Sequence, residues 1–159
     1  MNRQQRRASK AKRSIRAGGY TADHSAIYRL MSRVQPFAAP ELADLLTPVR
    51  IAFESFRRGE GEDSDFYTLA AAINVTMIRS ESIDPLCVET AQRAQAALMR
   101  ILARQSRIGR WGIDGQALQD IPPAIDLYEQ IMQLSTPLQM ADAIRETNAR
   151  MRAGEVLQS

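Results

Sequence analysis

Seven basic side chains and no acidic one lie among the first eighteen residues, and they are the strongest chemical signal in the chain: Arg3, Arg6, Arg7, Lys10, Lys12, Arg13 and Arg16. The chain has 21 Lys and Arg and 18 Asp and Glu, so residues 19–159 have 14 basic and 18 acidic side chains. The formal net charge of +3 therefore combines an arm of +7 with a body of −4. Such an arm attracts polyanions or an acidic protein surface.

The arm contains no aromatic residue between its basic ones. Guanidinium and ammonium groups alone bind the phosphates of DNA or RNA without reading bases, and their affinity falls steeply as salt rises. The sequence thus predicts nonspecific phosphate binding. A tail that binds acidic protein, or that has no dedicated role, is the alternative.

A second basic set lies on the helix expected from Asp84 to Ile108. Its members are seven, four and three residues apart and share one helical face: Arg93, Arg100, Arg104 and Arg107. Such a stripe, with Arg110 as an extension, could follow a nucleic-acid backbone. Pairing with acidic residues of the same domain is the favoured interpretation.

Residues able to support catalysis are few. The single histidine, His24, cannot build a triad or a two-histidine metal site. Cys87 follows Leu86 and precedes Val88, which indicates a core thiol rather than an activated nucleophile. We therefore expect no enzymatic activity and no catalytic residue.

Two acidic groups also lack the spacing of a metal site. Glu60, Glu62, Asp63 and Asp65 do not match a calcium loop and instead predict an exposed loop with a helix cap at Ser64. The second group is interrupted by proline and has no diagnostic spacing: Asp114, Asp120, Asp126 and Glu129. We expect no metal and no cofactor.

The hydropathy pattern gives no membrane segment. No apolar run approaches the roughly 20 residues that a membrane-spanning helix needs. A signal peptide requires an apolar stretch after its basic start, but Gly18–Gly19–Tyr20 follows Arg16. A mitochondrial transit peptide forms a helix with an apolar face. In this basic segment that face would consist almost entirely of Ile15. We expect a cytoplasmic protein without a membrane partner.

Helical periodicity predicts an all-α fold, an irregular antiparallel bundle of five or six helices over residues 20–159 behind a flexible basic arm, residues 1–19. Pro48 should kink the second helix or restart it. Pro122–Pro123 should separate a short helical segment from the start of the fifth helix. The helices are expected at about 21–34, 40–58, 65–81, 84–108, 124–134 and 136–154.

Each helix has an expected inward face. The longest shows the spacing of a helix-pairing seam between Ala91 and Gln105, which could pack inside the domain or receive a partner or a second copy. The last helix is expected to bury Leu138, Ala141, Ile144 and Met151. The others contribute, in chain order, Ile27, Leu30, Met31 and Val34; Leu42, Leu45, Leu46, Val49, Phe53 and Phe56; Phe66, Leu69, Ile73 and Met77; and Ile125, Tyr128, Ile131 and Met132.

The segment from Leu69 to Ile83 partly matches a helix-turn-helix. The motif needs a turn after Ile73, whereas Met77 continues the helical spacing. Ser80 also stands where the recognition helix needs an apolar anchor. We therefore disfavour this motif.

Several segments carry a family resemblance. The chain starts with MNRQQRR, and LLTPVRIAFESFRRG is followed by an acidic turn and LAAAINV. Further on, IDLYEQIMQLS precedes a helix with Ala and Arg. Together these segments resemble a family of small uncharacterised proteins associated with proteobacterial prophages and plasmids. The resemblance implies an accessory role in a bacterial mobile element and supplies no site residues.

The leading functional hypothesis is a non-enzymatic, nucleic-acid-associated accessory protein whose arm engages phosphates. The alternative is a helical protein-interaction or self-assembly module, such as a small regulator or a phage morphogenesis factor. In that alternative, the seam between Ala91 and Gln105 would pair with the partner.

Overall fold

The computed structural model describes residues 34–154 and confirms the all-α prediction. Five helices are present in this range and no strand: α3 (Ala39–Arg58), α4 (Asp63–Ser80), α5 (Pro85–Ile108), α6 (Ala117–Leu134) and α7 (Pro137–Ala153). Residues 1–33 and 155–159 lie outside the described part of the chain. The predicted arm and nearly all of the helix expected at 21–34 belong to this remainder. Val34, the last residue of that expected helix, was expected to face inward but is 53% exposed.

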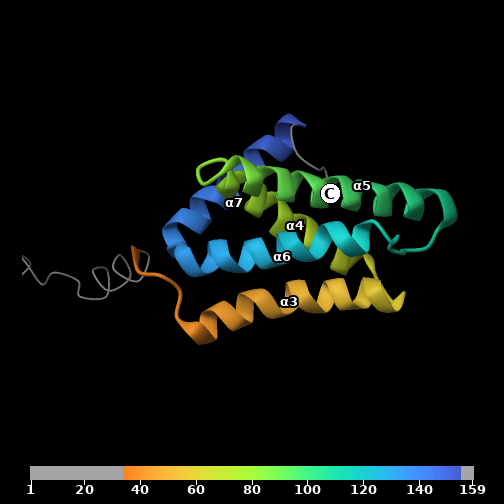
Figure 1. Ribbon diagram of the computed structural model, residues 1–159, viewed down its shortest axis with the longest axis horizontal. Coiled ribbons are helices and arrows are strands. Elements are labelled where there is room, and N and C mark those ends of the chain that lie inside the picture. The colour runs from red at the N-terminus through yellow and green to blue at the C-terminus, as the bar shows by residue number, and fades with distance from the viewer. Residues whose placement is uncertain (1–33, 155–159) are drawn as a thin grey trace, which may run out of the picture. The chain divides into compact units, whose positions relative to one another are not determined.

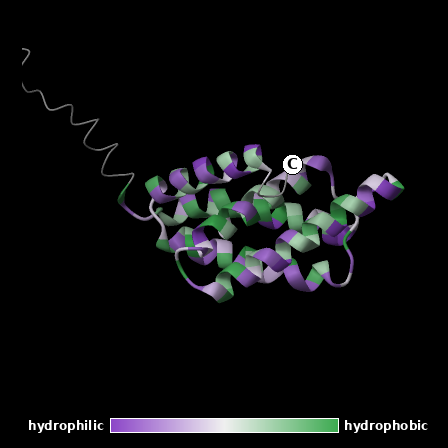
Figure 2. Cartoon of the chain, turned by 90° about the horizontal axis from the view of Figure 1, so that it is seen from above, coloured by the Kyte–Doolittle hydropathy of each residue, from purple (hydrophilic) through white to green (hydrophobic). Residues whose placement is uncertain are grey.

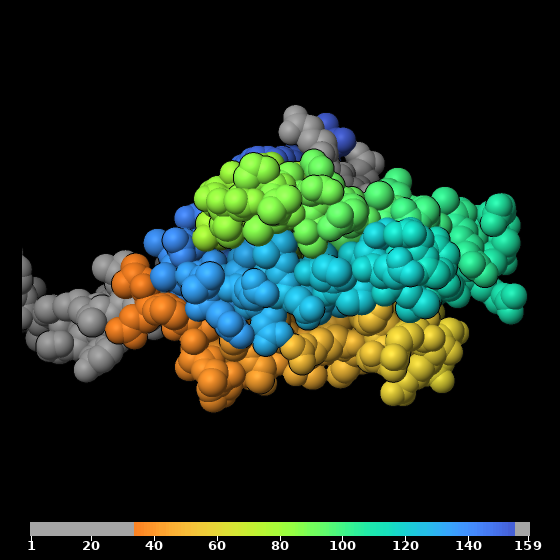
Figure 3. Space-filling model, viewed as in Figure 1, coloured from red at the N-terminus to blue at the C-terminus, as the bar shows by residue number. Residues whose placement is uncertain are grey.

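Helix α4 is the centre of the bundle, because it packs against α3, α5, α6 and α7. On the face shown in Figures 1 and 3, α6 lies between α5 and α3. Hydrophobic residues concentrate towards the middle of the bundle and hydrophilic residues along its outer turns (Figure 2). The main core includes Phe56, Phe66, Ile73 and Leu98, each at most 2% exposed.

Local sequence signals set most helix ends where they were expected. Proline occupies the first turn of α3, α5 and α7, where its missing N–H costs no helical hydrogen bond. Gly59, Gly109 and Gly154 end the same three helices with φ of 78°, 69° and 76°, a left-handed conformation that glycine adopts without strain. The expected cap at Ser64 is wrong. Helix α4 begins at Asp63, two residues before the expected Asp65, and its N-cap is Glu62, which forms a capping box with Asp65.

The prolines inside helices do not interrupt them. The expected break at Pro122–Pro123 is wrong, and of the two expectations for Pro48, a kink or a restart, the restart is wrong. Pro48 lies within continuous α3, and Pro122–Pro123 lies within continuous α6. A proline at position i leaves the carbonyl of residue i−4 without its donor. The three carbonyls concerned belong to the exposed residues Asp44, Leu118 and Gln119, where water can replace the lost donor.

The inward face of α7 also differs from the prediction. Met140, Ala143 and Thr147 are buried, whereas Leu138 and Ile144 are 39% and 48% exposed. Helix α7 packs mainly on α4, and Met140 and Ala143 join a small cluster with Val75. The side of α7 that meets α4 determines which residues are buried, and the apolar pattern of α7 alone did not identify that side.

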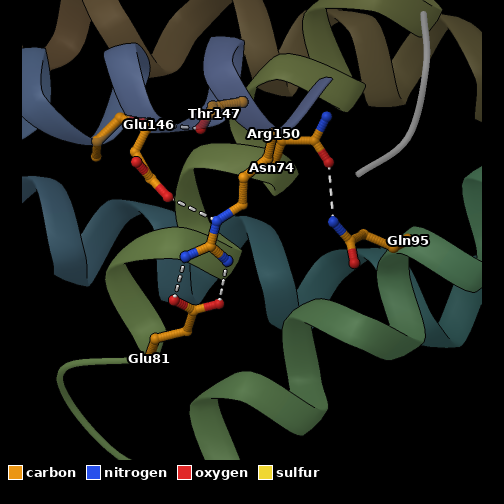
Figure 4. A network of polar contacts seen from close by, with 7 residues as sticks. Asn74, Glu81, Gln95, Glu146, Thr147 and Arg150 are labelled. Carbon is orange, nitrogen blue, oxygen red and sulfur yellow. Dashed lines mark hydrogen bonds and ion pairs between the residues drawn. The ribbon is translucent and has the colours of Figure 1, made fainter. Parts of the chain in front are cut away.

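Helix α4 runs without interruption through Asn74 and Val75, so the turn that a helix-turn-helix requires is absent from it. Asn74 is 1% exposed, and its Oδ1 accepts a hydrogen bond of 2.9 Å from Nε2 of Gln95 on α5 (Figure 4). Ser80, at the end of α4, is fully buried. The residues that suggested a DNA-reading motif therefore belong to the packing of α4 in the bundle.

The seam on α5 is occupied by the protein itself. Ala91, Ala94, Leu98 and Ile101 are at most 1% exposed, and α5 packs on α4 and α6. The proposal that this seam pairs with a partner helix is therefore wrong for the folded chain, because its own helices already cover these residues.

Arg150 on α7 forms an ionic clamp with the residue that follows α4. Its Nη1 and Nη2 donate to Oε1 and Oε2 of Glu81 at 2.5 and 2.8 Å, and its Nε donates to Glu146 at 2.8 Å (Figure 4). The hydrogen bonds from Arg150 lower the pKa of the Glu81 carboxyl below its ordinary value of 4.5. The same two carboxylates raise the pKa of Arg150.

We predict that Arg150→Gln lowers the free energy of unfolding by about 1 kcal/mol near neutral pH. The reason is that Arg150 pairs with Glu81 through two hydrogen bonds, and bidentate ion pairs are the strongest of those at protein surfaces. The folded-state pKa of Glu81 is depressed, so this stabilisation is present above the unfolded pKa near 4.5 and is lost as pH falls through the folded value. Denaturant titrations of both proteins, from neutral to acidic pH, should show the difference shrinking below about pH 4.5.

Arg145→Gln is the matched control, because Arg145 lies on the same helix, is 71% exposed and, within residues 34–154, pairs only with Asp142, three residues earlier. It should change stability by no more than about 0.5 kcal/mol. Two results would contradict the clamp: equal losses of stability in both variants, or a loss in Arg150→Gln that persists at acidic pH.

Candidate nucleic-acid interface

The predicted Arg stripe divides into two parts. Arg93 pairs with Glu89 at 3.2 Å, and Arg100 pairs with Asp114 at 3.4 Å and Asp120 at 3.0 Å. The favoured interpretation, pairing within the domain, therefore holds for these two residues. Arg104 and Arg107 form no ion pair with another residue of 34–154. The seven basic residues of the arm lie outside the described residues.

Arg104 borders a cleft of about 690 Å³ at one end of the bundle, which we call the end cleft. Two loops meet there, one after α3 and one after α5, on the right in Figure 1. Gly61 allows the first loop to lie directly on Phe56, since a Cβ at Gly61 would be 2.7 Å from Cδ1 of that ring. The charged side chains that line the end cleft are Arg57, Arg58, Glu60, Glu62, Arg104 and Arg110.

The lining of the end cleft is net positive, with four Arg and two Glu. Arg57 pairs with Glu54 on its own helix at 2.8 Å. Within residues 34–154, Arg58, Arg104 and Arg110 have no ion-pair partner. Arg57 and Arg58 also offset the negative end of the α3 dipole, which is a structural reason for their position. That role leaves the guanidinium group of Arg58 able to bind an anion, whereas Arg57 already donates to Glu54.

Trp111 borders the end cleft in a fixed orientation. Its ring stacks on Phe66 with centroids 5.0 Å apart and planes at 23°, and it meets Phe56 edge-on at 5.8 Å. The indole Nε1 donates to Oδ1 of Asp63 at 2.7 Å. The sequence analysis missed this residue as a site candidate, although a lone Trp between Gly109 and Gly112 beside Arg110 was a usable signal.

A second hollow, of about 540 Å³, lies among α3, α4 and α7, and we call it the apolar groove. Leu45, Tyr67 and Ile144 border it and are 40%, 50% and 48% exposed. Tyr128 lines it from α6, and burial raises the pKa of its hydroxyl. Leu45, Ile144 and Met151, which were expected in the core, border this groove instead.

Three of the four carboxylates in the proline-interrupted acidic group form ion pairs within the bundle. Asp114 and Asp120 pair with Arg100, and Glu129 pairs with Arg50. Within residues 34–154, no group of three or more His, Cys, Asp or Glu could hold a metal ion. Cys87 is only half-buried near the start of α5, so the prediction of a core thiol is wrong. His24 lies outside the described residues.

Comparisons with protein-family models, with curated proteins and with solved structures were then made. No match was found. The resemblance to prophage and plasmid proteins therefore remains a hypothesis from the sequence segments. Among the described helices, none combines the length and apolarity needed to cross a membrane.

Proposed function

We propose that the protein is a non-enzymatic, nucleic-acid-associated accessory protein of a mobile element, acting in the bacterial cytoplasm. The observation that carries the proposal is the separation of charge along the chain, an arm of +7 on a body of −4. The arm binds phosphates without sequence specificity. Electrostatic repulsion between the acidic body and a polyanion directs the contact to the arm.

The end cleft supports the proposal from within the folded body. Arg58, Arg104 and Arg110 come from α3, α5 and the loop after α5, and the fold brings them around one hollow. This is a local positive surface on a body whose overall charge is negative.

The proposal is tested by the salt dependence of binding. The full-length protein is titrated into labelled duplex DNA and labelled single-stranded RNA over a series of salt concentrations. Each phosphate contact with duplex DNA contributes about −0.9 to the slope of log affinity against log salt, so seven contacts give roughly −6. A slope near zero, or no binding at low salt, would contradict the proposal.

The alternative, a protein-interaction or self-assembly module, has support in the apolar groove. Its exposed Leu45, Tyr67 and Ile144 could receive the apolar face of a helix. If a second copy fills the groove, sedimentation will show an oligomer that Ile144→Glu dissociates and that removal of residues 1–18 leaves intact. A monomer at all concentrations would contradict self-assembly through this surface.

A further inference from the structure

The end cleft combines two kinds of group that recognise single-stranded nucleic acids. Arg58, Arg104 and Arg110 present guanidinium groups that suit phosphates, and Trp111 presents an aromatic ring. Proteins that bind single strands use this pairing, with cationic side chains along the backbone and aromatic rings under the bases. No other Trp occurs in the chain, so the fold places its only indole among arginines.

Trp111 is prepared for stacking, because its other contacts already fix it. Phe66 stacks on the ring, Phe56 holds it edge-on, and Asp63 accepts its N–H. Trp111 is nevertheless half-buried rather than buried, and it lines the cleft. A base that stacks there would lose its own conformational freedom but would require little reordering of the protein.

We infer that the end cleft binds a single-stranded nucleic acid, with one base against Trp111 and the adjoining phosphates on Arg58, Arg104 and Arg110. This inference rests on the proposed function and adds a preference to it. The arm binds any phosphate backbone, whereas the end cleft needs an unpaired base. A duplex keeps its bases stacked inside, so it can contact the arginines but not the indole.

The emission of Trp111 tests the inference directly, since no other Trp contributes to it. Full-length protein is titrated at low salt with labelled oligo-dT and with a labelled duplex of equal phosphate number, and anisotropy is recorded alongside Trp emission. Binding by anisotropy, with a change in Trp emission for oligo-dT alone, is the expected result. Binding without a change in emission, or an equal change with the duplex, overturns the inference and leaves the proposed function standing. No anisotropy change with either probe overturns both.

Two triple variants distinguish binding in the end cleft from an effect of the protein's net charge. Arg58→Gln/Arg104→Gln/Arg110→Gln should abolish the emission change and weaken oligo-dT binding on the order of tenfold. The matched control, Arg93→Gln/Arg145→Gln/Arg152→Gln, removes the same number of charges elsewhere and should retain the emission change. If both triple variants behave alike, the end cleft is not the binding site.

Trp111→Leu keeps an apolar side chain against Phe66 but removes the flat ring. It should weaken oligo-dT binding on the order of tenfold and leave duplex binding within about twofold. Trp111→Phe retains a smaller ring, so its affinity for oligo-dT should lie between those of Trp111→Leu and the natural protein. Equal loss of duplex binding would show that the substitution acts through folding or charge, and would overturn stacking.

Discussion

Leu98→Ala is expected to lower the free energy of unfolding by about 3–5 kcal/mol, near the upper end for buried Leu→Ala changes. Leu98 is fully buried on α5, in the main core where α4, α5 and α6 meet. Three other buried residues on the same helix are alanines, Ala91, Ala94 and Ala97. Because an alanine has no flexible side chain to move into a void, the cavity left by Leu98 should stay largely unfilled.

Denaturant unfolding should show a lower midpoint concentration for the variant, while the slope of unfolding free energy against denaturant concentration stays unchanged. Leu86→Ala provides the matched control, since Leu86 lies on the same helix and is 71% exposed. That variant should lose no more than about 0.5 kcal/mol. Similar losses at Leu98 and Leu86 would mean that the inward face of α5 has been assigned wrongly.

Replacing all seven basic residues of the arm by Gln is expected to weaken duplex binding at low salt by about a hundredfold or more. The affected residues are Arg3, Arg6, Arg7, Lys10, Lys12, Arg13 and Arg16. Each charge lost removes one counterion-releasing contact, so the slope of log affinity against log salt should also become shallower by roughly 6. The melting temperature should hardly change, because the main core consists of residues between Val49 and Ile125.

A smaller pair of variants tests whether position matters or only net charge. Arg3→Gln/Arg6→Gln/Arg7→Gln and Arg93→Gln/Arg145→Gln/Arg152→Gln each remove three positive charges. The arm variant should weaken duplex binding by about tenfold and the body variant by about threefold or less. Equal losses would assign the binding to the overall charge of the protein rather than to the arm.

The sequence predicted those parts of the fold that depend on neighbouring residues. The last helix was expected from residue 136, and Thr136 is the N-cap of α7. Its start depends on local residues: the side chain of Thr136 accepts a hydrogen bond from the backbone N–H of Gln139, and Pro137 occupies the first turn. Gly59 and Gly109 marked helix ends because only the backbone conformation at those residues matters. The Ala and Leu spacing on α5 identified its buried side correctly, since α5 packs on both α4 and α6.

The errors concern features that depend on contacts between distant segments. Whether Pro122–Pro123 ends a helix depends on whether the freed carbonyls reach water, and the exposure of Leu118 and Gln119 is a property of the fold. Ile144 has the spacing of a core residue, but α7 meets α4 with Met140 and Ala143. Local spacing cannot say which of two apolar sides will be covered.

The candidate site was predictable only in part. The charge of the arm and the common face of Arg93, Arg100, Arg104 and Arg107 are visible in the sequence. The sequence does not show that Arg100 is neutralised by Asp114 and Asp120, or that Arg104 meets the end of α3. Arg58 and Arg104 are 46 positions apart in the sequence. Their common cleft follows from the packing of α3, α4 and α5.

The most direct measurement compares the full-length chain with a fragment of residues 19–159 by fluorescence anisotropy. Labelled duplex DNA and labelled single-stranded RNA are each titrated at low and at high salt, and circular dichroism confirms that the fragment is helical. We predict strong, salt-sensitive binding by the full-length chain and binding weaker by at least about a hundredfold for duplex DNA with the fragment. Equal binding by both proteins, or none by the full-length chain at low salt, would contradict a nucleic-acid role for the arm and direct attention to the apolar groove.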